Sequence, residues 1–385
     1  MNIKNTDKQY IAHTYNRFDL LITRGKGALC YDENGREYID MTSGIGVNAF
    51  GYSDDEVVKA ITDQASTLTH TSNLYYTAPS AELAKILCER TGMKKVFFSN
   101  SGAESNECAI KAARKYAAAK KGGEYFHIVT MNRSFHGRTL TTLAATGQDS
   151  FHTQFLPLTE GFLYTEPEDI DGLRDLIGKY PTAAVMLECI QGEGGVNVLS
   201  KEYLQAVQAL CDEKDILLIV DEVQTGNGRT GALYSYMHYD LHPDIVSTAK
   251  GLAGGLPMGA TLLSEKVEDI FSYGDHGSTF GANPVCAAAA LSVQKRLDGD
   301  FLNEVKKKGE YIRKELEKTG AKVSGLGLML GVTTEKPVSD VIRECMDKGV
   351  LCLSAKDKLR LLPPLNIGYD ELKKAVEIIK TVLCS

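Results

Sequence analysis

The stretch from Lys95 to Lys120, KVFFSNSGAESNECAIKAARKYAAAK, decides the fold of this chain. The β-branched and aromatic run from Lys95 to Ser99 predicts a strand. The Ala- and Lys-rich run from Ala103 to Lys120 predicts an amphipathic helix, and Ser101 and Glu104 stand ahead of it at the spacing of a capping box. A strand followed at once by a helix is the first half of a βαβ unit.

Four more strands follow the same alternation of short apolar runs with segments of helical period. This alternation predicts an α/β protein with a mostly parallel central sheet. The further strands are expected near Phe126 to Met131, Ala183 to Glu188, Ile216 to Val220 and Ile245 to Ala249.

Both ends of the chain differ from this middle part and predict a smaller α+β domain. Near the N-terminus, Ala28 to Tyr31 and Glu37 to Met41 flank the step Asn34-Gly35, which is a strong hairpin signal. Beyond about residue 290 we expect a charged helix ending at Gly320, a strand around Leu326 to Val332, and helices near Val338 to Lys348 and Asp370 to Leu383. We therefore expect residues 1–45 and 291–385 in a small domain and residues 46–290 in a large one.

Composition sets limits on function. The 385 residues include 43 Lys and Arg against 50 Asp and Glu, a net charge of −7, and 43% are hydrophobic. These values exclude a disordered chain and argue against nonspecific nucleic-acid binding. The nine cysteines are scattered without a Cys-x-x-Cys pair, so we expect neither disulfides nor a metal site. The polar start MNIKNTDKQY and the short aliphatic runs predict a cytoplasmic protein with no membrane partner.

Polar residues and glycines gather directly after the predicted strands. In open α/β sheets, ligands bind outside the carboxyl ends of the strands, so these clusters predict one shared cleft and an enzyme. The clusters are Ser101-Gly-Ala-Glu104, Phe135-His-Gly-Arg138, Gly192-Glu-Gly-Gly195, Asp221-Glu-Val-Gln224 and Lys250-Gly251.

The first cluster can hold a phosphate, because Gly102 and Ala103 are small and begin a helix whose first amides lack intrahelical partners. A capped helix with a glycine turn is the commoner meaning of such a pattern. The stretch lacks the Gly-x-x-x-x-Gly-Lys-Ser/Thr spacing of a P-loop.

Asp221 and Lys250 each end a buried apolar strand. A buried Asp needs a cation, a metal or a protonated ring nitrogen as its partner, although a solvated Asp at a loop start fits Asp221 equally well. Most lysines are solvated, but the glycines after Lys250 leave space for a bound ring and favour a nucleophilic amine.

One cofactor needs all of these groups together. Pyridoxal 5′-phosphate requires a lysine for its aldehyde, an acid for its ring nitrogen, a phosphate cradle and an apolar cover for its ring. In this sequence Lys250, Asp221, the helix start at Gly102 and Ala103, and Phe135 fill these roles.

Six motifs together resemble the class III, or ω-, aminotransferases, over nearly the whole chain from about Tyr15 onward. The resemblance implies the α/β fold type I of the pyridoxal-phosphate-dependent transferases, which is aspartate aminotransferase-like. It also implies a homodimer with sites at the subunit interface. The motifs are Asn100-Ser-Gly-Ala-Glu-Ser-Asn106, Ser134-Phe-His-Gly-Arg138, Ile190-Gln-Gly-Glu-Gly-Gly-Val196, Asp221-Glu-Val-Gln-Thr-Gly226, Ala249-Lys-Gly251 and Gly277-Ser-Thr-Phe-Gly281.

The same resemblance implies a role for each residue around the cofactor. Lys250 would be the Schiff-base lysine and proton shuttle, and Asp221 the partner of the ring nitrogen. Phe135 would stack on the ring. The remaining contacts would come from Gly102 and Ala103 at the phosphate, Thr279 of the other subunit at the same phosphate, Val223 against the ring and Gln224 near the phenolic oxygen.

Four further residues would bind substrate. Arg138 would bind the far carboxylate, since a guanidinium can donate two parallel hydrogen bonds to it. Arg360 would bind the α-carboxylate of 2-oxoglutarate or glutamate, and Glu193 would pair with Arg360 while the ω-amino substrate is bound. Ser278 would also touch the substrate. Taken alone, each arginine fits a structural ion pair better.

The implied substrates are N-acetylornithine and 2-oxoglutarate, in arginine biosynthesis, with ornithine, succinylornithine, N-acetyllysine and 4-aminobutyrate as alternatives. Cys189, Ala282 and the run Phe50 to Asp55 depart from the usual family pattern, and none of them fills a cofactor role. A nicotinamide-dependent dehydrogenase would need a Gly-x-Gly-x-x-Gly fingerprint, which neither glycine cluster supplies. A non-catalytic relative would not need Lys250 and Asp221.

Overall fold

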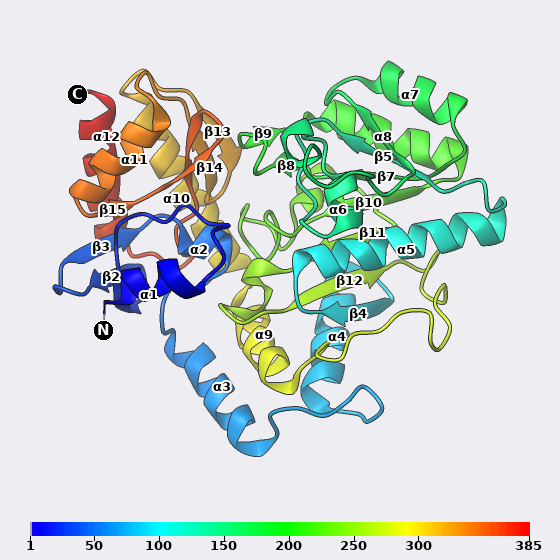
Figure 1. The fold of residues 1–385 in the computed structure, drawn as a ribbon, viewed down its shortest axis with the longest axis horizontal. Coiled ribbons are helices and arrows are strands. Elements are labelled where there is room, and N and C mark those ends of the chain that lie inside the picture. The colour runs from blue at the N-terminus through cyan, green and yellow to red at the C-terminus, as the bar shows by residue number, and fades with distance from the viewer. Residues whose placement is uncertain (1) are drawn as a thin grey trace.

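A seven-stranded sheet forms the centre of the molecule, as described for residues 2–385 in a computed structural model (Figure 1). All strands run parallel except β12, which runs against both of its neighbours. The predicted mostly parallel α/β fold is therefore confirmed. In spatial order the strands are β4 (Lys95–Ser99), β12 (Gly259–Leu263), β11 (Ile245–Thr248), β10 (Leu217–Asp221), β7 (Thr182–Leu187), β5 (His127–Met131) and β6 (Phe162–Thr165).

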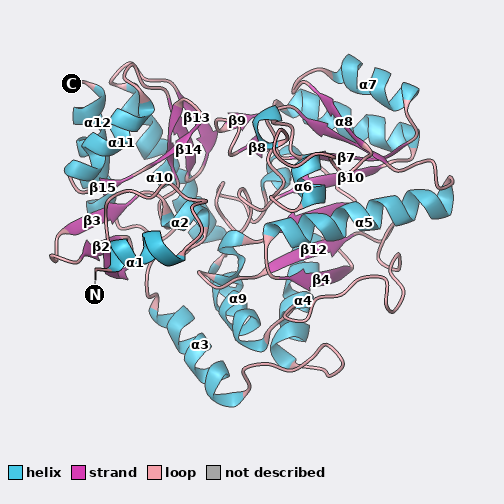
Figure 2. Cartoon of the chain, in the orientation of Figure 1, coloured by secondary structure: helices cyan, strands magenta, loops and turns pink. Residues whose placement is uncertain are grey.

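Helices cover both faces of this sheet, which explains why its central strands β7 and β10 are buried at every position. Alternate residues of β10 point to opposite faces: Leu217 and Ile219 pack with α5, whereas Leu218 and Val220 belong to the larger core on the other face. Figure 2 shows the helices around the strands. They are α3 (Asp55–Thr67), α4 (Ala78–Thr91), α5 (Gly102–Lys120), α6 (Leu140–Ala145), α7 (Ile170–Lys179), α8 (Lys201–Lys214) and α9 (Pro284–Arg296).

The two ends of the chain share a second unit, which Figure 1 shows on the left with both termini. The N-terminal hairpin and a C-terminal strand form one sheet, in which Val350 pairs with Ile39. Its strands are β1 (Ile22–Lys26), β2 (Leu29–Asp32), β3 (Glu37–Asp40) and β15 (Val350–Leu351); a further sheet holds β13 (Val323–Leu326), β14 (Met329–Val332), β17 (Lys358–Leu361) and β16 (Leu353–Ala355). The helices are α1 (Ile3–Tyr10), α10 (Gly299–Glu317), α11 (Val338–Asp347) and α12 (Tyr369–Leu383).

Two expectations for the ends need adjustment. The single strand expected around Leu326 to Val332 is wrong, because β13 and β14 form an antiparallel hairpin that turns at Gly327, where φ is 52°. The expected boundary at residue 290 lies inside α9. The expected segment 1–45 begins at Met1, which lies outside the described residues.

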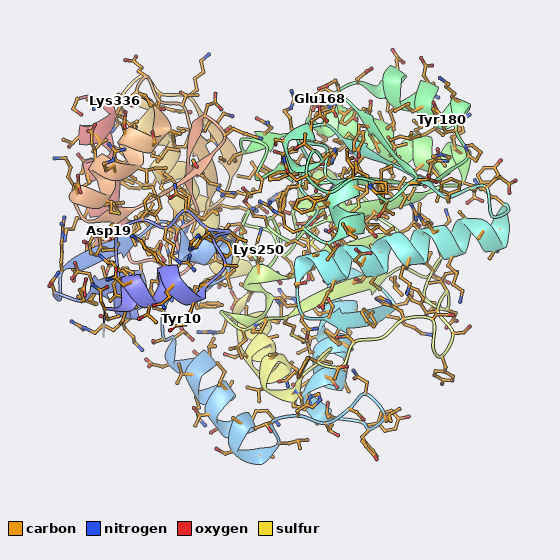
Figure 3. The ribbon with its side chains drawn as sticks, viewed as in Figure 1. Tyr10, Asp19, Glu168, Tyr180, Lys250 and Lys336 are labelled. Carbon is orange, nitrogen blue, oxygen red and sulfur yellow. The ribbon has the colours of Figure 1, made fainter. Side chains whose placement is uncertain are left out.

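Short elements complete the described chain. They are α2 (Ser43–Gly46), β8 (Ile190–Gln191), β9 (Asn197–Val198) and the 3₁₀ turns η1 (Asp149–Phe151), η2 (Ser235–Tyr239) and η3 (Lys250–Ala253). Within residues 2–385, no helix is long and apolar enough to span a membrane. Figure 3 labels Lys250, which lies between the two units, directly after β11.

Candidate active site

A cleft of about 640 Å³ opens at the carboxyl ends of the central strands. Its walls come from the loop before α5, from the loops after β5, β10 and β11, and from the N-terminal arm. The structure thus brings together most of the predicted site residues. The predicted residues that line the cleft are Gly102, Ala103, Phe135, Arg138, Asp221, Val223, Gln224 and Lys250. It is also lined by residues for which no role was predicted, including Tyr15, His136, Glu188 and Met258.

Asp221, the last residue of β10, is buried with its carboxylate fixed by three donors. Its Oδ2 accepts hydrogen bonds from His136 Nδ1 and from Asn106 Nδ2, both at 2.8 Å, and its Oδ1 accepts from the Val223 amide at 2.9 Å. Because an ionised carboxylate can only accept, Nδ1 of His136 carries the proton. The carboxylate is therefore aimed into the cleft at one fixed angle.

His136 and Asn106 are functional contacts that the sequence analysis missed. Asn106 also donates to the His136 carbonyl at 2.8 Å, so the amide ties α5 to the loop after β5. Two signals in the sequence could have found them. His136 stands between Phe135 and Arg138, and Asn106 lies four residues after Gly102 on the same face of the helix.

Glu188 was missed as well, although it directly follows β7 at the floor of the cleft. Its Oε2 accepts from the Phe135 amide at 2.9 Å, and its Oε1 accepts from the Gly192 amide at 3.3 Å. Burial raises the pKa of the Glu188 carboxyl to about 7, with His136 acting to lower it and Asp221 to raise it. Glu188 thus joins two loops of the site through one buried carboxyl group.

Lys250 begins the turn η3 directly after Ala249 and is partly exposed to the cleft. Its backbone is left-handed, with a φ of 44°, a conformation that costs energy for a residue with a side chain. Burial lowers the pKa of the Lys250 amine; Glu193 and Asp221 act to raise it, and Arg360 lowers it further. A lowered pKa favours the neutral, nucleophilic amine.

The start of α5 forms a cradle for an anion. Ser101 Oγ accepts from the Glu104 amide at 3.2 Å, which leaves the first-turn amides of Gly102 and Ala103 for a ligand. A Cβ atom at Gly102 would come within 2.6 Å of Val223 Cγ1, so only glycine fits there. This cradle, the Lys250 amine and the fixed carboxylate of Asp221 fit the phosphate, aldehyde and ring nitrogen of pyridoxal phosphate.

Phe135 and Arg138 lie on the loop after β5. The rings of Phe135 and Phe151 meet edge to face, with centroids 5.9 Å apart. The Arg138 guanidinium is exposed and lies 4.3 Å from the centroid of the Phe151 ring. A positive charge over an aromatic face is held there by the quadrupole of the ring, so Phe151 positions Arg138 at the cleft.

Arg360, on β17, reaches the site from the small unit and is 3% exposed. It forms an ion pair with Glu193, and its Nη1 also donates to Gln224 Oε1 at 3.1 Å. Burial raises the pKa of the Glu193 carboxyl, but the attraction of Arg360 outweighs it, so the pKa lies below its usual value. A carboxylate thus occupies the guanidinium when no other carboxylate is bound.

Four predicted residues are not among those that line the cleft. Glu193 and Arg360 lie behind it, where Arg360 contacts the lining residue Gln224. Ser278 and Thr279 lie elsewhere, in a second hollow together with Asn73, Phe97 and His276. Ser278 Oγ accepts there from Asn100 Nδ2 at 3.0 Å. Their expected contacts with substrate and phosphate therefore stay predictions.

The fold and the cleft together define an α/β protein in which a lysine amine of lowered pKa, a helix start with free first-turn amides and an arginine–carboxylate pair lie at one site. The family profile "Aminotransferase class-III" matches residues 10–383, and the chain belongs to this family. It is 51% identical to the acetylornithine aminotransferase of Haemophilus ducreyi, over 99% of this chain and 98% of that protein. It is 45% identical to the acetylornithine aminotransferase of Methanocaldococcus jannaschii, over 98% and 96%.

Solved structures agree on the fold. The ornithine aminotransferase of Toxoplasma gondii superposes with a TM-score of 0.95 at 32% identity, covering 99% of this chain and 94% of that one. The N-acetylornithine aminotransferase of Stenotrophomonas maltophilia superposes with a TM-score of 0.85 at 33% identity, covering 98% and 97%. The expected fold type and the enzyme class are thereby confirmed.

Proposed function

We propose that this chain is a pyridoxal 5′-phosphate-dependent aminotransferase that moves the terminal amino group of N2-acetylornithine to 2-oxoglutarate, in arginine biosynthesis. The products are N-acetylglutamate 5-semialdehyde and glutamate. One observation carries the proposal. The ion pair of Arg360 with Glu193 lies close enough to the Lys250 amine for both charges to shift the pKa of that amine. The names of the relatives at 51% and 45% identity supply the identity of the amino donor.

The residues of the cleft provide one contact for each part of the cofactor. When bound, pyridoxal phosphate acts as an electron sink that makes a hydrogen on the substrate carbon acidic. Asp221 would face its ring nitrogen, Phe135 and Val223 would enclose its ring, and Gln224 would lie near its phenolic oxygen. The amides of Gly102 and Ala103 would bind the phosphate.

Lys250 has two tasks in this proposal. Its Nζ would hold the cofactor through the aldehyde while no substrate is bound. With substrate bound, the free Nζ would act as the base that accepts the proton from the δ-carbon of the substrate and holds it at the cleft. The lowered pKa of Lys250 serves both tasks, because only the neutral amine can attack or accept a proton.

Arg360 and Glu193 would let one cleft accept two substrates of different charge. Glu193 neutralises Arg360 while the ω-amino substrate is bound, since that substrate has no carboxylate at this position. A carboxylate of 2-oxoglutarate then displaces Glu193, because both bind the same guanidinium. Arg138 would take the far carboxylate, and Ser278 would add a hydroxyl contact.

We also propose a homodimer in which Thr279 serves the phosphate of the partner subunit. Exposed apolar residues support it: Leu74 and Tyr75 are 88% and 70% exposed, and Phe280 is 60% exposed. Asn73 Nδ2 donates to the Ser278 carbonyl at 3.0 Å and so joins the loops that carry these residues.

We also propose that the protein is cytoplasmic. The nine cysteines, none of which forms a disulfide, support a reducing compartment.

Ornithine is the nearest alternative donor, and it appears in the name of the Toxoplasma relative. The acyl group has a chemical purpose, because the free α-amine of ornithine would cyclise onto the aldehyde product. We expect kcat/KM for N-acetylornithine to exceed that for ornithine at least about tenfold, the effect of one specific polar contact. An equal or higher value for ornithine would replace the proposed donor.

The variant Lys250→Ala tests the proposed nucleophile. We expect it to keep its circular dichroism spectrum and to lose both transamination and the visible absorbance of covalently bound cofactor. Lys295→Ala is the matched control, because Lys295 forms a surface ion pair with Glu82 at 2.7 Å. Transamination that persists in Lys250→Ala would refute the assignment.

A further inference from the structure

Two residues with left-handed backbones lie against each other behind the cleft. Lys250 has a φ of 44° and Asn227, in the loop after β10, has a φ of 56°. Such a conformation is unfavourable for a residue with a side chain and persists only where the surroundings hold it. The contacts around Lys250 therefore have to include something that holds this turn.

Asn227 supplies that contact. Its side chain is buried, and its Nδ2 donates to Thr248 Oγ1 at 2.9 Å and to the Ala249 carbonyl at 3.1 Å. The Ala249 carbonyl belongs to the peptide bond that leads into Lys250. The Asn227 amide thus hydrogen-bonds both to the last residue of β11 and to the peptide group that precedes Lys250.

Gln294, on α9, orients this amide. Its Nε2 donates to Asn227 Oδ1 at 2.9 Å, and Gln294 is 1% exposed. A donor on Oδ1 fixes the oxygen toward α9 and the NH₂ group toward β11. The backbone of Gln294 is also held, because its main-chain carbonyl accepts from Arg90 Nη1 at 2.7 Å.

We infer that Asn227, oriented by Gln294, is a positioning residue that holds the left-handed turn of Lys250 so that its amine meets the cofactor aldehyde. Neither residue lines the cleft, and both act only through the backbone of Lys250. The inference rests on the role proposed above for Lys250. A shift of about 1 Å in such a group costs up to about a hundredfold in rate.

A purely structural role would have a different signature. Buried amides also stabilise a fold simply by satisfying their neighbours, and their loss would then lower the melting temperature alone. The rate at which the apoenzyme captures pyridoxal phosphate separates the two roles, since that rate depends on where the Lys250 amine lies.

The test measures this capture rate by visible absorbance, together with its pH midpoint, kcat and KM for N-acetylornithine, and the melting temperature of each apoenzyme. Asn227→Gly keeps access to a positive φ and removes the amide. Asn227→Asp keeps the shape but turns a carboxylate toward the Ala249 carbonyl. Gln294→Met removes only the orienting donor. Ser200→Ala, which removes the N-cap of α8, is the control for lowered stability alone.

We expect capture to slow at least about tenfold in both Asn227 variants and about threefold in Gln294→Met, with kcat falling and KM nearly unchanged. Because Asn227 and Gln294 act as one unit, the double variant should capture no more slowly than Asn227→Gly alone. Ser200→Ala should lose melting temperature and capture at the wild-type rate.

Capture within about twofold of wild type in Asn227→Gly and Gln294→Met, with a lowered melting temperature, would overturn the inference. If the Asn227 variants do not fold, the capture rate of Gln294→Met alone decides whether the inference holds, by the same criterion. A wild-type apoenzyme that captures no cofactor, or captures it equally well as Lys250→Ala, would instead contradict the proposed function.

Discussion

At the scale of single residues, the charges around Lys250 set its reactivity. Burial lowers the pKa of its amine, Glu193 opposes that shift, and Arg360 adds to it. The pair formed by Glu193 and Arg360 therefore has an effect besides the proposed one on substrate, because the two partners shift the pKa of Lys250 in opposite directions. A change in either partner should be visible in the titration of Lys250.

Glu193→Gln should lower the pKa of Lys250 further. The variant removes the negative charge that raises this pKa and leaves the positive charge of Arg360 without a counterion. The neutral amine then exists at lower pH, so the capture of pyridoxal phosphate by the apoenzyme should reach its half-maximal rate at lower pH than in the wild type. Glu213→Gln, at an exposed carboxylate that pairs with Arg174, is the control. A midpoint that stays in place or rises would contradict this electrostatic account.

The sequence could identify residues that act through their own chemistry, and it could not identify those that act through a distant partner. Lys250 and Asp221 stand at the ends of apolar strands, where a charged side chain is costly unless it has a partner. Glu188, by contrast, acts by accepting the amide of Phe135, which lies 53 residues away. Such contacts depend on how loops from different strands pack together, and a short stretch of sequence does not predict that packing.

At the scale of elements, a partly buried ion pair joins α3 and α9. Arg296, at the end of α9, donates to both carboxylate oxygens of Asp54, at 2.8 and 3.1 Å. Asp54 also caps α3, since its Oδ1 accepts from the Val57 amide at 3.1 Å. The Arg296 guanidinium lies 3.7 Å from the centroid of the Phe50 ring. One carboxylate thus fixes the start of one helix and the end of another.

Asp54→Ala should lower the free energy of unfolding by about 2 kcal/mol, because it removes an N-cap and leaves the partly buried Arg296 with only its longer contact to Glu56, at 3.6 Å, as an ion pair. Burial raises the pKa of Asp54, but Arg296 outweighs it, so the folded pKa lies below the ordinary 3.8. The stability from this group is therefore present above pH 3.8 and is lost as the pH falls through the lowered folded pKa. Denaturant unfolding at neutral and acidic pH measures the difference.

Asp63→Ala is the matched control on the same helix, since the pair of Asp63 with Lys59 is exposed. It should change the free energy of unfolding by less than about 0.5 kcal/mol. An effect of Asp54→Ala equally small, or one that grows at low pH, would show that the junction does not depend on this pair.

Elements with a strong local signal were predictable to within one or two residues. The strand β4 has its predicted bounds, and α5 begins one residue before the predicted start. The Ser101 side chain caps α5 as predicted, although Glu104 reaches the Asn100 amide in place of the cap residue. The hairpin of β13 and β14 was not predictable as such, because Gly325 and Gly327 fit a glycine-rich strand as well as a turn.

At the scale of the whole molecule, the two ends of the chain complete a site that the middle builds. The N-terminal arm brings Tyr15 to the cleft, and β17 brings Arg360 against Gln224, one of the residues that line it. Thr279 lies in a hollow outside that cleft, which fits the proposal that it serves a partner subunit. Two inactive variants, each lacking a residue that the other still has, should therefore regain activity when they form a mixed dimer.

Lys250→Ala and Thr279→Asp provide this complementation test. Each variant alone should be weakly active or inactive. A mixed dimer has one intact site, with Lys250 from one subunit and Thr279 from the other. Equal mixing after reversible dissociation should restore about a quarter of the wild-type activity, because half of the dimers are mixed and each holds one intact site of two. Activity no greater than the average of the two variants would contradict the shared site.

The most direct test of the account is to reduce the holoenzyme with borohydride, which fixes the cofactor onto the amine that holds it, and to map the labelled peptide. We predict that the cofactor is found on Lys250, which lines the cleft and whose amine has a lowered pKa. A Lys250 peptide that remains unlabelled, or a label on another lysine, would contradict the account.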